Sequence, residues 1–199
     1  MASIDFWFSI GSTYSYLSVM RLSSFAQESG IDFVWRPFNV RAIMLEQNNI
    51  PFAHKPVNAA YMWRDIERRA AKYGLSPRLP VPYPIEDLPL ANQVALLGMR
   101  EGWGIAYTIE TYRLWFEESQ PAGSEPNLAR SLERLGLEPR ETLARATAPE
   151  VVEALADATV TAKGLGVFGS PSFVVDREVF WGDDRMEDAA IWKQSGRLG

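Results

Sequence analysis

The segment Asp5–Tyr16 constrains the fold of this chain more than any other part of the sequence. Its first half is almost continuously apolar, which is typical of a strand that is buried on both faces. Gly11 then allows a tight turn, and Ser12 belongs to the residue types that cap helix N-termini. Apolar residues recur at roughly helical spacing from there to Gly30. The segment therefore predicts a strand that leads directly into a helix.

The junction at Ser12 is a place where an anion can bind. The first N–H groups of a helix have no acceptor within the helix, and the helix dipole is positive at this end. A phosphate, a carboxylate or a thiolate would therefore be stabilised there. The simpler alternative is that Ser12 serves only as a helix cap.

Both ends of the chain predict short strands. Residues 32–38 follow the first helix and predict a second strand, which should be parallel to the first because the connection between them is helical. Near the C-terminus, residues 172–176 and 179–181 predict a hairpin with its turn at residues 177–178. The final helix is expected to begin at the two aspartates that follow Gly182.

The middle of the chain has a helical pattern. We expect helices over these ranges: 41–47, 58–73, 90–101, 106–118, 127–135, 140–146 and 151–163. Residues 75–89 contain five prolines and predict a stiff loop instead. This block contains no internal repeat. The pattern therefore predicts one helical segment between the strands of the two ends.

The order of these elements defines a fold class. A β-α-β unit, a block of helices and a β-β-α unit form the plan of a thioredoxin-like fold with a helical insertion. We therefore predict an α/β protein with a thioredoxin-like mixed sheet and a large all-helical insertion. The thioredoxin-like domain would be discontinuous and comprise residues 1–38 and 164–199, and the insertion domain would comprise residues 39–163.

The composition excludes several kinds of chemistry. None of the 199 residues is a cysteine, which excludes disulfides, cysteine nucleophiles and thiolate metal ligands. The single histidine, His54, lies in a loop between prolines and cannot build a multi-histidine metal centre. We therefore expect a surface histidine and no metal site.

Charge and hydropathy limit the partners of this chain. The formal net charge is −5 and there is no basic block, which argues against nucleic acid or an anionic membrane as a partner. No apolar run reaches the length of about 18 residues that a membrane span needs. The N-terminus lacks the basic and apolar regions of an export signal, so we expect a cytoplasmic protein.

Thioredoxin-like folds place their reactive groups in a fixed position. A Cys-x-x-Cys motif starts the first helix, and a cis-proline before a later strand faces it. Here Ser12–Ser15 occupies the place of that motif, and Pro171 is the candidate cis-proline. Because hydroxyls replace both sulfurs, this chain alone cannot exchange disulfides, and any thiol must come from elsewhere.

Five stretches, in order along the chain, resemble a known family. They are Gly11–Leu17, Asn49–Pro51, Tyr61–Arg68, Gly166–Phe173 and Phe180–Arg185. On these stretches the chain resembles, nearly from end to end, the family of kappa-class glutathione transferases and 2-hydroxychromene-2-carboxylate isomerases, and the last stretch resembles the isomerase branch. The resemblance implies glutathione as a cofactor and a serine in place of the reactive cysteine.

The resemblance also implies roles for individual residues. Ser12 would hydrogen-bond the glutathione sulfur and favour its thiolate. Asn49 would contact the tripeptide near its glycyl or cysteinyl portion, unless it is only a turn residue. Ser170, just before Pro171, would offer its backbone groups to the cysteinyl main chain, as an added strand would.

The resemblance places the γ-glutamyl end of glutathione at the start of the last helix. Asp184 would be the partner of its ammonium group, and the helix N-terminus that Asp183 and Asp184 open would receive its carboxylate. The alternative is that both aspartates only cap the helix, and the two roles are compatible.

Two further groups of residues have open roles. Arg64, Arg68 and Arg69 are expected to form a solvated helix face, with binding of a substrate carboxylate as the alternative. Four aromatic residues are expected in the core rather than in the wall of a substrate site: Tyr14, Tyr16, Trp63 and Trp115.

A bound thiolate suggests the reaction. If a thiolate adds to a conjugated double bond, the bond becomes single, rotates and forms again when the thiolate leaves. We therefore expect a glutathione-dependent cis-trans isomerase, which acts on a small aromatic-degradation intermediate through a thiolate held by Ser12. The alternatives are a kappa-like transferase that conjugates glutathione to small electrophiles, and an adaptor that binds a protein or peptide beside Pro171. The resemblance further implies a homodimer.

Overall fold

The two ends of the chain build one mixed sheet. Within residues 3–49, 52 and 55–198, which the computed structural model describes, the sheet has four strands in the order β2-β1-β3-β4. The strand bounds are Ser3–Phe8 for β1, Asp32–Pro37 for β2, Ser172–Val175 for β3 and Glu178–Trp181 for β4. β1 runs parallel to β2 and antiparallel to β3, and β3 runs antiparallel to β4. The predicted mixed sheet is confirmed, including the parallel pairing of the first two strands.

Aromatic side chains fill the core of the sheet. Phe6 and Phe8 in β1 are fully buried, and Trp7 between them is almost fully buried, so this strand is buried on both faces as predicted. The ring centroid of Phe6 lies 5.2 Å from that of Phe173 in β3 and 5.0 Å from that of Trp35 in β2. Cross-strand aromatic pairs of this kind stabilise the register in which Phe6 lies opposite both residues.

Nine α-helices occupy much of the remaining described chain. Their bounds are Thr13–Ser29 (α1), Val40–Glu46 (α2), Pro56–Lys72 (α3), Leu88–Glu101 (α4), Gly104–Glu118 (α5), Asn127–Arg134 (α6), Pro139–Ala146 (α7), Pro149–Gly164 (α8) and Met186–Ser195 (α9). Four of them carry a proline in the first turn, where its missing N–H would have no partner within the helix. The predicted loop 75–89 is therefore wrong at its end, because Pro89 lies in the first turn of α4.

The C-terminal region differs slightly from the prediction. The two turn residues of the hairpin are Asp176 and Arg177, with φ values of 48° and 79°, so the predicted turn lies one residue too late. Positive φ at both central positions is typical of the hairpin turn that matches the twist of its strands. After β4, the chain forms a short 3-10 turn, Asp183–Arg185 (η1), before α9 begins. The two aspartates therefore precede the last α-helix rather than start it.

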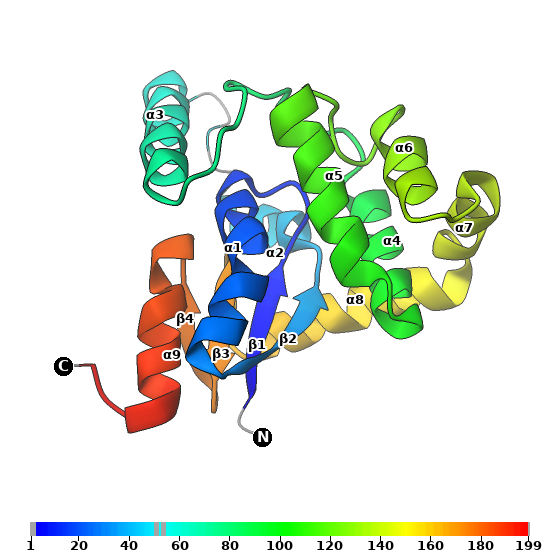
Figure 1. The fold of residues 1–199 in the computed structure, drawn as a ribbon. Coiled ribbons are helices and arrows are strands. Elements are labelled where there is room, and N and C mark those ends of the chain that lie inside the picture. Colours follow the sequence, from blue (N-terminus) through cyan, green and yellow to red (C-terminus); the bar gives the residue numbers. More distant parts are fainter. Residues whose placement is uncertain (1–2, 50–51, 53–54, 199) are drawn as a thin grey trace.

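Figure 1 shows how the helices surround the sheet. In this view α1 and α9 lie in front of it, α8 passes behind it, and α4, α5, α6 and α7 gather to one side. α3 stands above the ends at which α1 and α9 begin. All helices from α2 to α8 fall between β2 and β3 in the sequence, while the exact domain boundaries remain a prediction. Each helix in the described part of the chain is too short or too polar to cross a bilayer.

Candidate functional site

Ser12 lies at the start of α1, after the turn that follows β1. It is the N-cap of this helix, and its Oγ accepts a hydrogen bond from the N–H of Ser15 at 3.4 Å. The same hydroxyl donates to the backbone oxygen of Ser170 at 2.6 Å. The Ser170–Pro171 peptide bond is cis. The structure therefore places Ser12 against the loop that contains Ser170 and Pro171 (the proline loop), as the thioredoxin-like plan predicts.

Two polar side chains of the helical segment fix the turn before Ser12. Asn92 in α4 is fully buried, accepts a hydrogen bond from the N–H of Ile10 at 2.8 Å and donates to the oxygen of Ile10 at 2.9 Å. Tyr112 in α5 donates to the oxygen of Ser12 at 3.0 Å. Because the backbone bonds side chains here instead of a neighbouring strand, β1 ends at Phe8, earlier than the apolar pattern predicts.

Gly11 allows the helical segment to pack closely against this turn. Its φ of +118° is a conformation that residues with a Cβ rarely adopt. A Cβ at this position would also lie 2.7 Å from Cδ1 of Leu88, at the start of α4. The conformation therefore favours glycine here, and a Cβ would in addition force the side chain of Leu88 to shift.

The side chain of Ser170 has a structural role. It is buried, and its Oγ accepts a hydrogen bond from the N–H of Ser9 at 2.8 Å and shares another with Oγ of Ser15 at 2.8 Å. These bonds join the proline loop to the end of β1 and to the first turn of α1. The backbone oxygen of Ser170 is the group that contacts Ser12.

Asn49 is positioned by the end of α2. It is exposed in the turn after α2, and its N–H donates to the oxygen of Met44 at 2.9 Å. In the part of the chain that the structure describes, no hydrogen bond joins Asn49 to Ser12 or to the other predicted site residues. The rest of its predicted loop, residues 50–51, lies outside the described residues, and so does His54.

Asp183 and Asp184 differ in their access to solvent. The side chain of Asp183 is 2% exposed; it accepts a hydrogen bond from the hydroxyl of Tyr73 at 3.3 Å and lies 3.6 Å from Nη1 of Arg69. The side chain of Asp184 is 37% exposed, and its Oδ2 lies 3.4 Å from Nη2 of Arg69 and 3.3 Å from Nη2 of Arg185. Of the two aspartates, Asp184 is therefore the one that a ligand can reach.

Burial and neighbouring charges set the protonation of this cluster. Burial raises the pKa of Asp183 to about 6. The positive charge of Arg69 opposes this rise in pKa, and the negative charge of Asp184 adds to it. Burial of Arg69 favours its neutral form, but the carboxylates of Asp65 and Asp183 outweigh that effect and raise its pKa. Arg69 is therefore a permanent positive charge between carboxylates.

The predicted solvated arginine face is wrong for Arg69. Its Nε donates to Oδ2 of Asp65 at 2.8 Å, and its side chain is only 28% exposed. Arg64 and Arg68 on the same helix agree better with the prediction, because more than half of each side chain is exposed. The spacing of Asp65 and Arg69 indicates a pair on one helix face. No sequence signal indicates the contact with Asp184, which lies 115 positions further along the chain.

The four aromatic residues expected in the core divide into two pairs. Tyr16 and Trp115 are fully buried, as predicted. Tyr14 and Trp63 are only partly buried. The hydroxyl of Tyr14 donates to Asp65 at 3.1 Å, and burial together with the charge of Asp65 raises the pKa of Tyr14. Tyr14 therefore remains a neutral hydrogen-bond donor two residues after Ser12.

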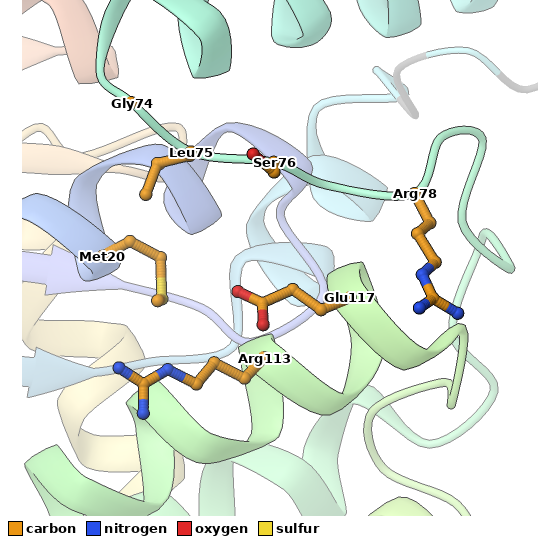
Figure 2. A pocket seen from close by; sticks show the side chains of 7 residues that line it. All are labelled: Met20, Gly74, Leu75, Ser76, Arg78, Arg113 and Glu117. Carbon is orange, nitrogen blue, oxygen red and sulfur yellow. The ribbon is translucent and has the colours of Figure 1, made fainter.

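A separate hollow of about 680 Å³ lies between α1, α5 and the chain that follows α3 (Figure 2). Met20, Leu75, Arg113 and Glu117 are among the residues that line it. None of the predicted site residues contributes to its lining. The hollow is therefore distinct from the site at Ser12.

Fold and site together define a class of protein. A thioredoxin-like sheet carries a serine at the start of α1, opposite a cis-proline, in a chain without cysteine. In the described ranges, no group of three or more histidine, aspartate or glutamate side chains is placed to hold a metal ion. The chain belongs to the family of DSBA-like thioredoxin domains, whose family model matches residues 3–190.

Within this family, the chain is similar to 2-hydroxychromene-2-carboxylate isomerases, among other proteins. A 2-hydroxychromene-2-carboxylate isomerase from Sphingobium xenophagum is 28% identical over 188 residues, which cover 93% of this chain and 94% of the relative. The isomerase of the same name from Pseudomonas putida is 24% identical over 185 residues, which cover 92% and 90% of the two chains. A solved structure of a 2-hydroxychromene-2-carboxylate isomerase matches with a TM-score of 0.83 and 24% identity, and the match covers 96% of this chain and 95% of that one. The resemblance to these isomerases is thereby confirmed.

Proposed function

We propose that this chain is a glutathione-dependent cis-trans isomerase of the 2-hydroxychromene-2-carboxylate isomerase type. The observation that carries the proposal is the hydroxyl of Ser12, which lies at the N-terminus of α1 and 2.6 Å from the oxygen of Ser170. Similarity over nearly the whole chain to two isomerases of this name supports the reaction type. The substrate is then a small aromatic-degradation intermediate.

The groups around Ser12 fit glutathione as the cofactor. The chain has no cysteine, so a thiol must come with the ligand. The first N–H groups of α1 have no acceptor within the helix and favour an anion such as a thiolate. When bound, glutathione supplies the thiolate that adds reversibly to the conjugated double bond and so permits its rotation.

Ser12 has the task of stabilising that thiolate. Its hydroxyl hydrogen can rotate from the oxygen of Ser170 to the sulfur, because a hydroxyl proton is free to turn about the C–O bond. One hydrogen bond to an anion contributes about 1.5–3 kcal/mol, which corresponds to about one to two pKa units of the thiol. The oxygen of Ser170 is then free to accept an N–H of the cysteinyl main chain.

The far ends of glutathione have separate partners in this proposal. Asp184 binds the γ-glutamyl ammonium group, because its carboxylate is exposed while that of Asp183 is buried. The side chain of Asp183 is too buried to reach the ligand and instead contacts Arg69, which lies beside Asp184. Asn49, exposed after α2, contacts the glycyl or cysteinyl portion.

The proposed reaction is tested with 2-hydroxychromene-2-carboxylate and less than one equivalent of glutathione. We expect many turnovers to the ring-opened hydroxybenzylidene pyruvate, with the glutathione recovered unchanged. A stable thioether product would identify a kappa-like transferase instead. If calorimetry showed no glutathione binding at millimolar concentration, an adaptor that binds a protein or peptide beside Pro171 would be the better interpretation.

The resemblance also supports a proposal for the oligomeric state and the location of the enzyme. We propose a homodimer in the cytoplasm, with a small aromatic molecule as its substrate. Light scattering on the purified protein tests the assembly, since a dimer has twice the mass of the chain.

A further inference from the structure

Arg69 and Asp184 present opposite charges side by side. Nη2 of Arg69 lies 3.4 Å from Oδ2 of Asp184, and the two side chains are 28% and 37% exposed. They come from α3 and η1, and their pairing joins these two elements. Both charges are therefore held together and remain within reach of a ligand.

One partly buried and one fully enclosed carboxylate fix the position of Arg69. Its Nε donates to Oδ2 of Asp65 at 2.8 Å, and its Nη1 lies 3.6 Å from Oδ2 of Asp183. These carboxylates are 14% and 2% exposed, and the hydroxyl of Tyr73 donates to that of Asp183. A ligand that binds Arg69 would therefore meet a guanidinium that is already ordered, which lowers the entropy cost of binding.

The backbone of the proline loop connects this charged pair to Ser12 on one side. Ser12 donates to the oxygen of Ser170, next to Pro171. The oxygen of Pro171 accepts a hydrogen bond from the N–H of Gly182 at 3.0 Å, and Asp184 follows two residues later. These two hydrogen bonds of the proline loop therefore connect Ser12, the proposed partner of the sulfur, with the segment that carries Asp184.

A second connection runs through α3. Tyr14, in the first turn of α1, donates to Asp65 at 3.1 Å, and Asp65 binds Arg69. Figure 1 shows the arrangement that allows this, because α3 stands above the starts of both α1 and α9. Arg69 and Ser12 therefore belong to one connected region of the structure.

We propose that Arg69 binds the α-carboxylate of the γ-glutamyl group while Asp184 binds its α-ammonium, so that Arg69 selects thiols with an α-amino-acid head group. This inference rests on the proposed function. An α-amino acid carries its two opposite charges on one carbon atom, which matches the adjacent charges of Arg69 and Asp184. A guanidinium also binds a carboxylate through two parallel N–H bonds, which a lysine cannot provide.

The proposal is tested by calorimetric titration of the purified protein with three thiols. They are glutathione, 4-aminobutyryl-Cys-Gly, which lacks the α-carboxylate, and glutaryl-Cys-Gly, which lacks the α-ammonium. We expect the wild-type protein to bind glutathione about 10- to 100-fold more tightly than either analogue, as for the loss of one charge-assisted hydrogen bond.

Variants assign each preference to one residue. In Arg69→Gln, the preference for glutathione over 4-aminobutyryl-Cys-Gly should fall to nearly one, while the preference over glutaryl-Cys-Gly persists. Asp184→Asn should show the reverse. Arg69→Lys keeps the positive charge but not the planar guanidinium group. This variant should keep part of the preference for glutathione over 4-aminobutyryl-Cys-Gly. Arg64→Gln is the matched control, because Arg64 lies exposed on the same helix and pairs with Glu67.

The outcomes separate this inference from the proposed function. If Arg69→Gln weakens the binding of all three thiols by the same factor, Arg69 is only structural and the inference is wrong while the proposed function stands. If the wild-type protein binds no glutathione, both are wrong. If Arg69→Gln does not fold, Arg69→Lys and Asp184→Asn provide the same comparison, and unchanged preferences in both overturn the inference.

Discussion

The hydroxyl of Ser12 combines a structural role with the proposed chemical one. It accepts a hydrogen bond from the N–H of Ser15 and donates to the oxygen of Ser170. A serine hydroxyl has one donor and two acceptor positions, so the cap persists when the donor turns to another partner. Capping the helix and stabilising a thiolate are therefore compatible at this residue.

Asp183 makes the stability of the protein depend on pH in an unusual direction. Its pKa is raised to about 6, so the folded state binds its proton more tightly than the unfolded state does. The stability that this proton contributes is present below pH about 4 and is lost as the pH rises through about 6. The wild-type protein should therefore lose on the order of 3 kcal/mol between pH 4 and pH 7 relative to Asp183→Asn, as urea denaturation at each pH would measure.

A surface aspartate provides the control for this prediction. Asp157 is exposed on α8, and Asp157→Asn should leave the pH dependence of unfolding as it is in the wild-type protein. If Asp183→Asn and the wild-type protein showed parallel curves from pH 4 to pH 7, the account of Asp183 would be wrong.

Among the elements, α5 contacts the start of α1 directly. The fully buried Tyr112 shares its one hydroxyl hydrogen between the oxygen of Ser12, at 3.0 Å, and that of Ser9, at 3.2 Å. In Tyr112→Phe this hydrogen bond to the turn is lost, so we expect the free energy of unfolding to fall by about 0.5–1.5 kcal/mol and glutathione affinity to fall with it. Urea denaturation and calorimetry would measure the two effects.

Tyr16 offers a matched control on α1. It is also fully buried, but within the described residues its hydroxyl has no hydrogen-bond partner. Tyr16→Phe removes no hydrogen bond and relieves a buried hydroxyl of its missing partner, so the free energy of unfolding should not fall and should rise by up to about 1–3 kcal/mol. Equal losses in both variants would show that the bonds of Tyr112 do not hold the turn.

The elements themselves could mostly be predicted from the sequence. The apolar run before Gly11, the caps at Ser12 and Gly30 and the proline-rich segment are local signals, and the structure has the corresponding elements. Their boundaries differ where a tertiary contact intervenes, as at the end of β1. The juxtaposition of Ser12 and Pro171 could be predicted because the thioredoxin-like plan determines it.

Several residues around the site could not be predicted. Asn92 is a polar residue in a largely apolar helix, which indicates that it has a buried partner but does not identify Ile10. Tyr112 resembles any other core aromatic residue in its sequence context. The contact between Arg69 and Asp184 depends on how α3 and η1 both pack against α1, and no local sequence pattern indicates such packing.

At the scale of the whole molecule, the helical segment takes part in building the site. The two ends of the chain provide the sheet, Ser12 and the proline loop. α3, α4 and α5 provide the residues that hold the turn and the charged cluster. The site is therefore shared by parts of the chain that the predicted domain division separates.

The thiol pKa of bound glutathione tests the central claim most directly. Ultraviolet titration of the thiolate in the complex should give a pKa about one to two units below the value near 8.5 of a free thiol. Ser12→Ala should bring the pKa back towards that value, and Ser12→Thr, which keeps a hydroxyl, should preserve the lowered pKa. An equal thiol pKa in the wild-type and Ser12→Ala complexes would contradict the claim that Ser12 holds the thiolate.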